Sequence, residues 1–411
     1  MSALTFVLRA QDAVSNLAGQ AQVSGATNGT GAAALFSDPA SVVVDVGGNY
    51  FIADTRNDAI RKITPAGVVS TFAGKLGVAG IVNATGTSAE FDSPNGLAFD
   101  ASGNLFVSDT GNNVIRKITP SGAVSTFAGV AGAGGFLDGT TAAALFSSPL
   151  GLAVASDGSV YVADSGNHCI RKISGGAVTT FAGTPQVWGS ADGTGTNAMF
   201  NSPCGLKFNA NGGLMVSDSN NHTIRKIKTS GAVTTYAGTA GQDGAVDGDV
   251  SVARFRNPAE MAFDFRGNLY VADSFNQTIR KISTNGIVST VSGAAGMAGA
   301  NSGTNGEGRF FNPYGVAVAA DGSLVVVDTY NELVRTVIVP FTLSLQLASQ
   351  AHTASITWDT VIGKKYQVQY KAGLVANWTN FGAVVTAAGY GLNATDDSAT
   401  GMKVYRVLLV P

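Results

Sequence analysis

The chain reads SPNGLAFD at residues 93–100, GNLFVSDTGN at 103–112 and VIRKI at 114–118, and an equivalent stretch occurs six times along the sequence. Each copy opens with a proline and closes its second apolar run with an aspartate. The prolines are Pro39, Pro94, Pro149, Pro203, Pro258 and Pro313, and the aspartates are Asp54, Asp109, Asp164, Asp218, Asp273 and Asp328. Both series advance by 55, 55, 54, 55 and 55 residues. A fixed period of this length is typical of a repeated supersecondary unit.

Each copy contains four short apolar runs, which in the second copy span residues 96–100, 105–109, 114–118 and 123–127. The first two runs are separated by Gly103-Asn104, or by Asp-Gly and Asn-Gly pairs in other copies. These residues accept the positive φ of tight hairpin turns. Four strands joined by hairpins and repeated radially are the blades of a β-propeller. The sequence therefore predicts an all-β chain with a six-bladed propeller.

The two ends of the repeat region complement one another. Residues 13–19 match the fourth-run pattern at 123–129, although no first three runs precede them. The sixth copy ends near Val337 and lacks a fourth run of its own. We therefore expect the N-terminal strand at 13–19 to complete the last blade and close the ring, which removes an exposed sheet edge.

The combined pattern resembles the NHL repeat, the blade unit of a large group of propellers. The resemblance rests on Pro-x-Gly-hydrophobic, then GNLFVSD-x-x-Asn, then Ile-Arg-Lys-Ile, and it extends over residues 13–339. Members of this group differ in function, so the resemblance implies a fold and not an activity.

The repeat stops after residue 340, and the remaining residues alternate between apolar and polar at period two. This alternation predicts a small antiparallel β-sandwich at 341–411, next to a propeller at 1–340. Trp358, the segment 366–370, Asn377-Trp378 and the segment 405–407 resemble the fibronectin type III or immunoglobulin-like modules of bacterial surface proteins. The aromatic residues Trp358, Tyr366 and Tyr370 are expected in its core.

The composition favours a protein outside the cell. Only 13% of the 411 residues are charged, 53 are glycine, and the formal net charge is -2. These values provide no field that would attract a polyanion, so we expect no nucleic-acid partner. No stretch is long and apolar enough to span a membrane. The apolar run at residues 4–8 lacks the flanks of a signal peptide, so we expect either a removed signal or release by another route, as for virion components.

An arginine follows each repeated aspartate by seven residues. These arginines are Arg61, Arg116, Arg171, Arg225, Arg280 and Arg335. A guanidinium at this spacing can bridge the turn that follows the aspartate to a neighbouring segment. Because the pair is present in every copy, we interpret the aspartates and arginines as structural residues.

A local function is expected where the sixfold pattern breaks. The second position after each proline holds glycine in four copies, serine in one and Glu260 in one. The fourth position holds alanine in four copies, valine in one and Lys207 in one. Innermost strands crowd around the channel, which explains the small residues. Lys207 and Glu260 are therefore candidate channel residues, either as an ion pair between blades or as a polar pocket for a small ligand.

Metal catalysis is a weaker hypothesis. The architecture resembles gluconolactonase-like hydrolases, which hold a channel calcium, and zinc-dependent amidoglycolate lyases. Calcium needs several oxygen ligands, and only Glu260 is evident. The three histidines are His168, His222 and His352, and the first two occupy one equivalent turn position. We therefore predict no cofactor, with channel calcium as the alternative.

These observations favour a non-catalytic, extracellular or cell-surface binding or scaffolding protein that recognises a protein or glycan through the loops on one face of the propeller. A second hypothesis is a structural part of a homo-oligomer or larger assembly, such as a virion appendage or surface filament, docked by residues 341–411. A third is a metal-dependent hydrolase or lyase acting in the channel.

Overall fold

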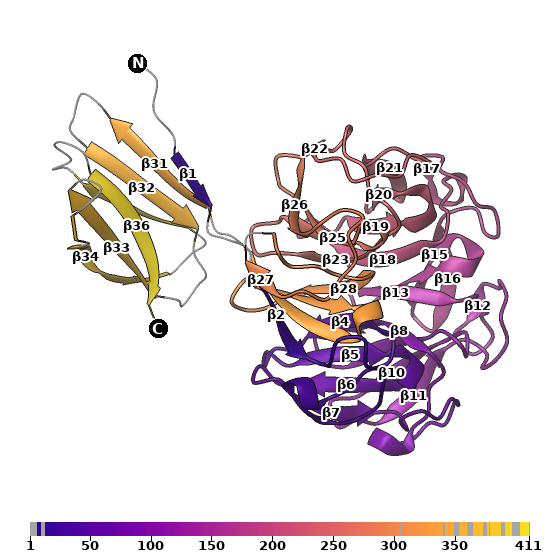
Figure 1. Cartoon of the computed structure of the whole chain (residues 1–411). Coiled ribbons are helices and arrows are strands. Elements are labelled where there is room, and N and C mark those ends of the chain that lie inside the picture. The colour runs from indigo at the N-terminus through magenta and orange to yellow at the C-terminus, as the bar shows by residue number, and fades with distance from the viewer. Residues whose placement is uncertain are drawn as a thin grey trace. The chain divides into compact units, whose positions relative to one another are not determined.

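The structure, a computed structural model, describes residues 6–9, 13–304, 306–339, 342–348, 353–359, 365–372, 376–377, 379–387, 391–396 and 403–410 (Figure 1). Its contacts divide the chain into two compact units, one of residues 13–337 and one of residues 1–12 with 338–411. The first unit consists of six antiparallel sheets arranged as blades. The predicted six-bladed propeller is confirmed.

Each blade contains four main strands, which follow one another in order from the channel to the outside of the propeller. The innermost strands are β4 (Pro39–Val44), β8 (Pro94–Phe99), β13 (Pro149–Val154), β18 (Pro203–Phe208), β23 (Pro258–Phe263) and β28 (Pro313–Val318). The second strands are β5 (Tyr50–Asp54), β9 (Leu105–Asp109), β14 (Val160–Asp164), β19 (Leu214–Asp218), β24 (Leu269–Asp273) and β29 (Leu324–Asp328).

The third strands are β6 (Ala59–Ile63), β10 (Val114–Ile118), β15 (Cys169–Ser174), β20 (Thr223–Ile227), β25 (Thr278–Ile282) and β30 (Leu333–Ile338). The fourth strands are β7 (Val68–Ala73), β11 (Val124–Ala128), β16 (Ala177–Ala182), β21 (Ala232–Ala237), β26 (Ile287–Gly293) and β2 (Ala13–Ala18). Short outer strands pair with the fourth strand in five blades: β3 (Gly29–Thr30), β12 (Gly139–Thr140), β17 (Gly193–Thr194), β22 (Gly248–Asp249) and β27 (Gly303–Thr304).

The ring closes as the sequence predicts. Strand β2 lies between β27 and β30 in the last sheet, and Val14 pairs with Gly303. The final blade is therefore built from both ends of the repeat region.

Short 3-10 helices connect the second and third strands in five blades. They are η2 (Thr55–Asn57), η4 (Ser165–Asn167), η6 (Ser219–Asn221), η7 (Ser274–Asn276) and η8 (Thr329–Asn331). Three more lie in the loops that enter a blade: η1 (Gly31–Ala33), η3 (Gly86–Ser88) and η5 (Gly195–Asn197). Each inner-strand proline pairs with the aspartate that ends the second strand, as Pro39 does with Asp54. The turns after the second strands and the entering loops therefore share one end of the propeller, which we call the loop face.

The hydrophobic core lies between neighbouring blades. One cluster joins Phe51 and Ile60 of the first blade to Leu97 and Val107 of the second. Each blade buries one face against the next blade, so no blade has a complete core of its own. This arrangement explains why the repeat must close into a ring.

The second unit contains two antiparallel sheets. One sheet has the order β1 (Phe6–Arg9), β31 (Thr342–Ala348), β32 (Thr353–Asp359) and β35 (Gly391–Asp396), and the other has β34 (Thr379–Thr386), β33 (Lys365–Ala372) and β36 (Lys403–Val410). Trp358 and Tyr366 are buried in its core, and Tyr370 packs against that core. Trp378 and His352 lie outside the described residues. The fibronectin-like or immunoglobulin-like identity of this unit stays a prediction.

Candidate functional site

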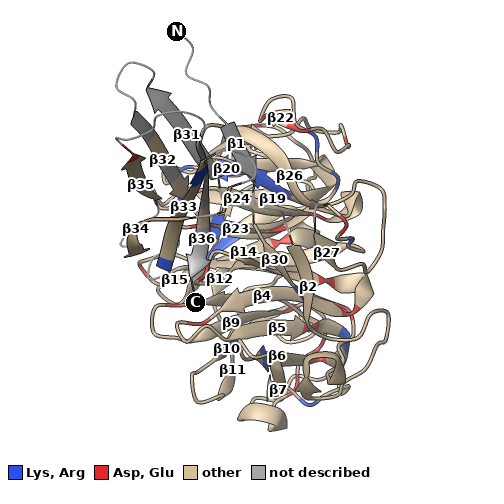
Figure 2. Cartoon of the chain, turned by 60° about the vertical axis from the view of Figure 1, so that its left-hand side comes forward, with Lys and Arg blue, Asp and Glu red and all other residues tan. Residues whose placement is uncertain are grey.

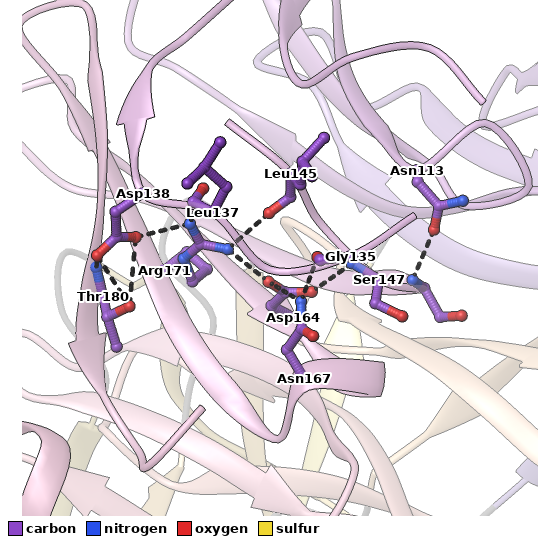
Figure 3. Close-up of polar contacts among 11 residues, drawn as sticks. Asn113, Gly135, Leu137, Asp138, Leu145, Ser147, Asp164, Asn167, Arg171 and Thr180 are labelled. Carbon is purple, nitrogen blue, oxygen red and sulfur yellow. Dashed lines mark hydrogen bonds and ion pairs between the residues drawn. The ribbon is translucent and has the colours of Figure 1, made fainter. Parts of the chain in front are cut away.

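The repeated aspartate and arginine meet in a buried ion pair, shown for the third blade in Figure 3. Arg171 donates from NH1 to Asp164 at 2.7 Å and to the carbonyl oxygen of Leu145 at 2.9 Å. Its NH2 group donates to the carbonyl oxygen of Leu137 at 2.8 Å and to Asp138 at 2.7 Å. The arginine thus fixes the loop that enters its own blade at two places.

Asp164 is the acceptor at the centre of this network. It accepts the backbone N–H of Ser147 at 2.8 Å and the Asn167 amide at 2.8 Å, as well as the guanidinium of Arg171. Burial raises the pKa of the Asp164 carboxyl to about 6, and the Asn167, Ser147 and Arg171 donors oppose that rise. A buried carboxylate with this many donors is costly to leave unpaired.

The same pair occurs in every blade, with both side chains buried. The N···O distances are 2.6 Å for Arg61–Asp54, 2.6 Å for Arg116–Asp109, 2.7 Å for Arg171–Asp164, 2.8 Å for Arg225–Asp218, 2.8 Å for Arg280–Asp273 and 3.0 Å for Arg335–Asp328. Each guanidinium also lies over a buried phenylalanine of the entering loop, as Arg171 does over Phe146 at 5.2 Å. Repetition of this buried ion pair in all six blades is consistent with a structural role, although the Nε of each arginine has no hydrogen-bond partner among the described residues.

The link to the next blade comes from a different residue. The residue after each 3-10 turn adopts a left-handed conformation, and its side chain accepts the backbone N–H just before the next proline. His168 Nδ1 accepts from Ser202 at 3.1 Å, and His222 Nδ1 accepts from Asn257 at 3.2 Å. Burial lowers the pKa of both histidines, so the neutral imidazole serves as the acceptor. Sequence reasoning interpreted these histidines as ordinary turn residues and did not find this contact.

The inner strands enclose a pocket of about 380 Å³ in the central channel. Its wall contains residues from all six blades; most of them are apolar in type, but the surface they expose to the pocket is more polar than apolar. Close packing of the strands requires the glycines, because a Cβ on Gly151 would lie 2.2 Å from the carbonyl oxygen of Cys204 in the next blade. Lys207 and Glu260 supply the charge in this wall.

Lys207 and Glu260 face the same pocket from adjacent blades. The described residues show no ion pair between them, although the two charges interact across the channel. Burial raises the pKa of Glu260 to about 7, while Lys207 and the backbone N–H groups of Val42 and Val316 oppose that rise. Surrounding protein lowers the pKa of Lys207, even though its side chain remains accessible within the channel. The two opposite charges therefore share one pocket without forming an ion pair in the described part of the chain.

Three further polar residues occupy the channel nearer the loop face. The Cys204 sulfur and the Tyr314 hydroxyl lie 2.8 Å apart, although they come from the fourth and sixth blades. Asn95 of the second blade and Glu260 both influence the pKa of Tyr314, which burial raises well above its usual value. All three residues directly follow a repeat proline, so comparing that position among the copies could have found them.

The loop face carries an aromatic group on the fifth and sixth blades. Phe275 and Tyr330 occupy the middle of η7 and η8 and are 47% and 48% exposed. Tyr330 packs edge to face with Phe311 at 5.2 Å between ring centroids. The equivalent position holds Arg56, glycine or asparagine in the other four blades. The loop face therefore has an asymmetry of its own.

Charges elsewhere on the propeller are scattered in both signs (Figure 2). Within the described part of the chain, no group of three or more His, Cys, Asp or Glu residues could hold a metal ion. Both cysteines, Cys169 and Cys204, are free and buried. No helix among the described residues is long and apolar enough to cross a membrane.

Comparison with known proteins supports the class of fold. The NHL repeat family matches residues 146–173, which extend from the entering loop of the third blade to its third strand. The chain is thus a six-bladed β-propeller in which residues 146–173 match the NHL repeat.

Two similar proteins are longer than this chain. The chain is 29% identical over 270 residues to the chloroplastic protein SUPPRESSOR OF QUENCHING 1 of Arabidopsis thaliana. This match covers 61% of this chain and 25% of that protein. It is also 29% identical over 283 residues to NHL repeat-containing protein 2 of Bos taurus. This second match covers 60% of this chain and 39% of that protein. The chain therefore spans well under half the length of these relatives.

Among solved structures, an auxiliary nutrient binding protein of Bacteroides thetaiotaomicron has a TM-score of 0.62 and 14% identity. The match covers 80% of this chain and 77% of that one. At this identity the likeness concerns the fold alone.

Proposed function

We propose that this chain is a non-catalytic, extracellular or cell-surface binding protein that recognises a protein or glycan partner through its loop face. The observation that carries the proposal is the exposure of Phe275 and Tyr330 on the loop face of the fifth and sixth blades, where Tyr330 packs against Phe311. Exposed aromatic rings beside polar groups are typical of recognition surfaces. They interrupt the sixfold pattern, so they are not required by the blade itself.

The rest of the loop face supports this role by its rigidity. The backbone N–H of Phe275 donates to the carbonyl oxygen of Arg256 at 3.1 Å, and that of Tyr330 donates to Phe311 at 3.1 Å. Both turns are therefore tied to the loops that enter their blades. A surface that is already ordered loses little entropy on binding.

Two other functions are weighed against this one. A structural part of a larger assembly would use residues 341–411 for docking, and the mass of the purified protein in solution tests it. A channel hydrolase or lyase would need a metal near Glu260, and a metal analysis of the same sample tests that role. One tightly bound calcium or zinc per chain, lost in Glu260→Gln, would replace the proposal.

The direct test is a glycan array together with cross-linking to surface proteins, using the full chain. The double variant Phe275→Ser with Tyr330→Ser removes the two exposed rings of the fifth and sixth blades and leaves Trp188 of the fourth entering loop, which is 70% exposed, in place. Phe265→Ser is the matched control, because Phe265 is 49% exposed in a turn at the opposite end of the blade. We expect a ligand that binds the wild type and the control but binds the double variant at least tenfold more weakly. Equal binding by all three proteins would contradict the proposal.

A further inference from the structure

The central channel carries a second kind of site, which is separate from the loop face. Its pocket is lined by the inner-strand residues from the second to the fifth position after each proline, in the half of the channel nearest the first hairpin turns. A volume of about 380 Å³ holds roughly ten water-sized groups, which is within the usual range for a small-ligand site.

The two charges in this pocket have no structural task that the repeat requires. The position of Lys207 is filled by Ala98, Ala153, Ala262 and Ala317 in four other blades, and that of Glu260 by glycine in four. Introducing a charge into a narrow apolar channel costs stability unless a partner neutralises it. The described residues provide no ion pair for either side chain, and the backbone N–H groups of Val42 and Val316 compensate only part of the cost for Glu260.

The pocket wall determines what else a ligand must carry. Around the two charges lie Val43, Ala98, Ala153, Ala262 and Ala317, which form an apolar ring at the level of Lys207. Phe99, Phe208 and Phe263 follow one position further along their strands. A bound molecule would therefore place an apolar side chain against this ring of small residues and present its polar groups to Lys207 and Glu260.

Charge complementarity then selects the class of ligand. A dianion would meet the Glu260 carboxylate, and a dication would meet the Lys207 ammonium. A molecule with one charge of each sign neutralises both groups at once. We propose that the channel binds a small zwitterion of the α-amino-acid type with an apolar side chain, its carboxylate on Lys207 and its ammonium on Glu260.

Neighbouring groups fit this orientation. The Cys204–Tyr314 contact lies at the loop-face side of Glu260, and Tyr314 is close enough to Glu260 for the two to interact. These bulky side chains narrow the channel there, so the ligand enters from the end with the hairpin turns. This site is independent of the loop-face proposal, and each can fail without the other.

The test measures binding of L-leucine to the full chain by calorimetry and by the shift in melting temperature. Two companions each lack one charge: 4-methylpentanoate has no ammonium, and isopentylamine has no carboxylate. We expect leucine to bind and raise the melting temperature, and both companions to bind at least tenfold more weakly. Equal affinity for all three, or no binding of leucine at millimolar concentration, would overturn the proposal.

Variants taken from the repeat itself locate the site. Lys207→Ala and Glu260→Gly install residues that other blades already have at these positions, so both variants should fold. Each should weaken leucine binding at least tenfold, whereas Lys228→Ala, at an exposed lysine of the same blade, should leave it unchanged. Unchanged binding in Lys207→Ala and Glu260→Gly would contradict the assignment.

Melting temperatures of the two variants without any ligand provide a second test. If the charges serve a ligand, both variants should melt at or above the temperature of the wild type. If the charges stabilise each other instead, each single variant should melt lower, and the double variant should lose less than the sum of the two. That second result would show an ion pair between blades and would overturn the proposal.

Discussion

In the part of the chain that the structure describes, the charged residues inside the blades form ion pairs, whereas the two charged residues in the channel wall do not. In each blade, the Asp and Arg side chains lie 2.6 to 3.0 Å apart, and backbone groups satisfy many of their other hydrogen-bond donors and acceptors. In the channel, Lys207 and Glu260 share a pocket but form no ion pair among the described residues. The difference teaches that a charge repeated in all blades is paired within its blade, while the two charges that occur once line the channel without an ion pair to any described residue.

The largest effect is expected from breaking a buried pair. Arg171→Met keeps much of the side-chain volume but leaves Asp164 without its cation and two loop carbonyls without a donor. Losing one partner of a buried pair costs about 3–5 kcal/mol of the free energy of unfolding. Chemical denaturation followed by circular dichroism measures the change.

Arg56→Met is the matched control for this variant. Arg56 is 74% exposed and pairs with Asp38 at the surface, where such a pair contributes about 1 kcal/mol or less. If Arg171→Met and Arg56→Met shift the denaturation midpoint equally, the buried network does not hold the blade in the way described.

An intermediate effect is expected at the glycines that line the channel. In Gly151→Ala, the new Cβ would meet the Cys204 carbonyl oxygen at 2.2 Å, so an inner strand must move. Such overpacking costs about 1–3 kcal/mol, measured as a fall in the denaturation midpoint. Full stability in Gly151→Ala would mean that the inner strands separate more easily than their packing indicates.

Ser41→Ala tests the equivalent position in the first blade, where a Cβ is already accommodated. The Ser41 hydroxyl lies near the Glu260 carboxyl but makes no hydrogen bond within the described residues. Its removal should therefore change the free energy of unfolding by about 0.5 kcal/mol or less.

A pH-dependent effect is expected at the joint between the last and first blades. Glu332 accepts the backbone N–H of Asp38 at 2.7 Å, and burial followed by the nearby Asp38 charge raises the pKa of Glu332 to about 7. The folded chain then binds more protons than the unfolded chain between pH 4.5 and 7, so stability falls as the pH rises through this window.

Glu332→Gln should remove that part of the slope and stabilise the chain above pH 7 by about 1 kcal/mol, since the site is partly solvated. Melting temperatures at pH 5 and pH 8 measure this change in pH dependence.

Gln277, the equivalent residue of the fifth blade, already accepts the backbone N–H of Asn312 at 2.6 Å. Gln277→Glu should introduce a weaker dependence of stability on pH, because the residue next to position 277 is the neutral Asn312 and not an aspartate such as Asp38. An unchanged slope in Glu332→Gln would assign the pH dependence to another group.

The sequence by itself determined the parts that are periodic. Four apolar runs per copy, turn pairs between them and the missing fourth run at the end were enough to predict six blades and closure by residues 13–19, because strand formation and hairpin turns depend on local residue types. The breaks at Lys207 and Glu260 were also visible, since a charge among alanines and glycines stands out in aligned copies.

Only the tertiary structure decided which of these residues meet. Arg171 binds carbonyl oxygens of Leu137 and Leu145, and carbonyl groups are the same at every residue, so no sequence pattern could identify them. The contact between Cys204 and Tyr314 spans 110 residues and depends on how the blades converge on the channel. The separation of Lys207 from Glu260 is likewise set by the positions of two inner strands, which the packing between blades fixes and the order of residues does not.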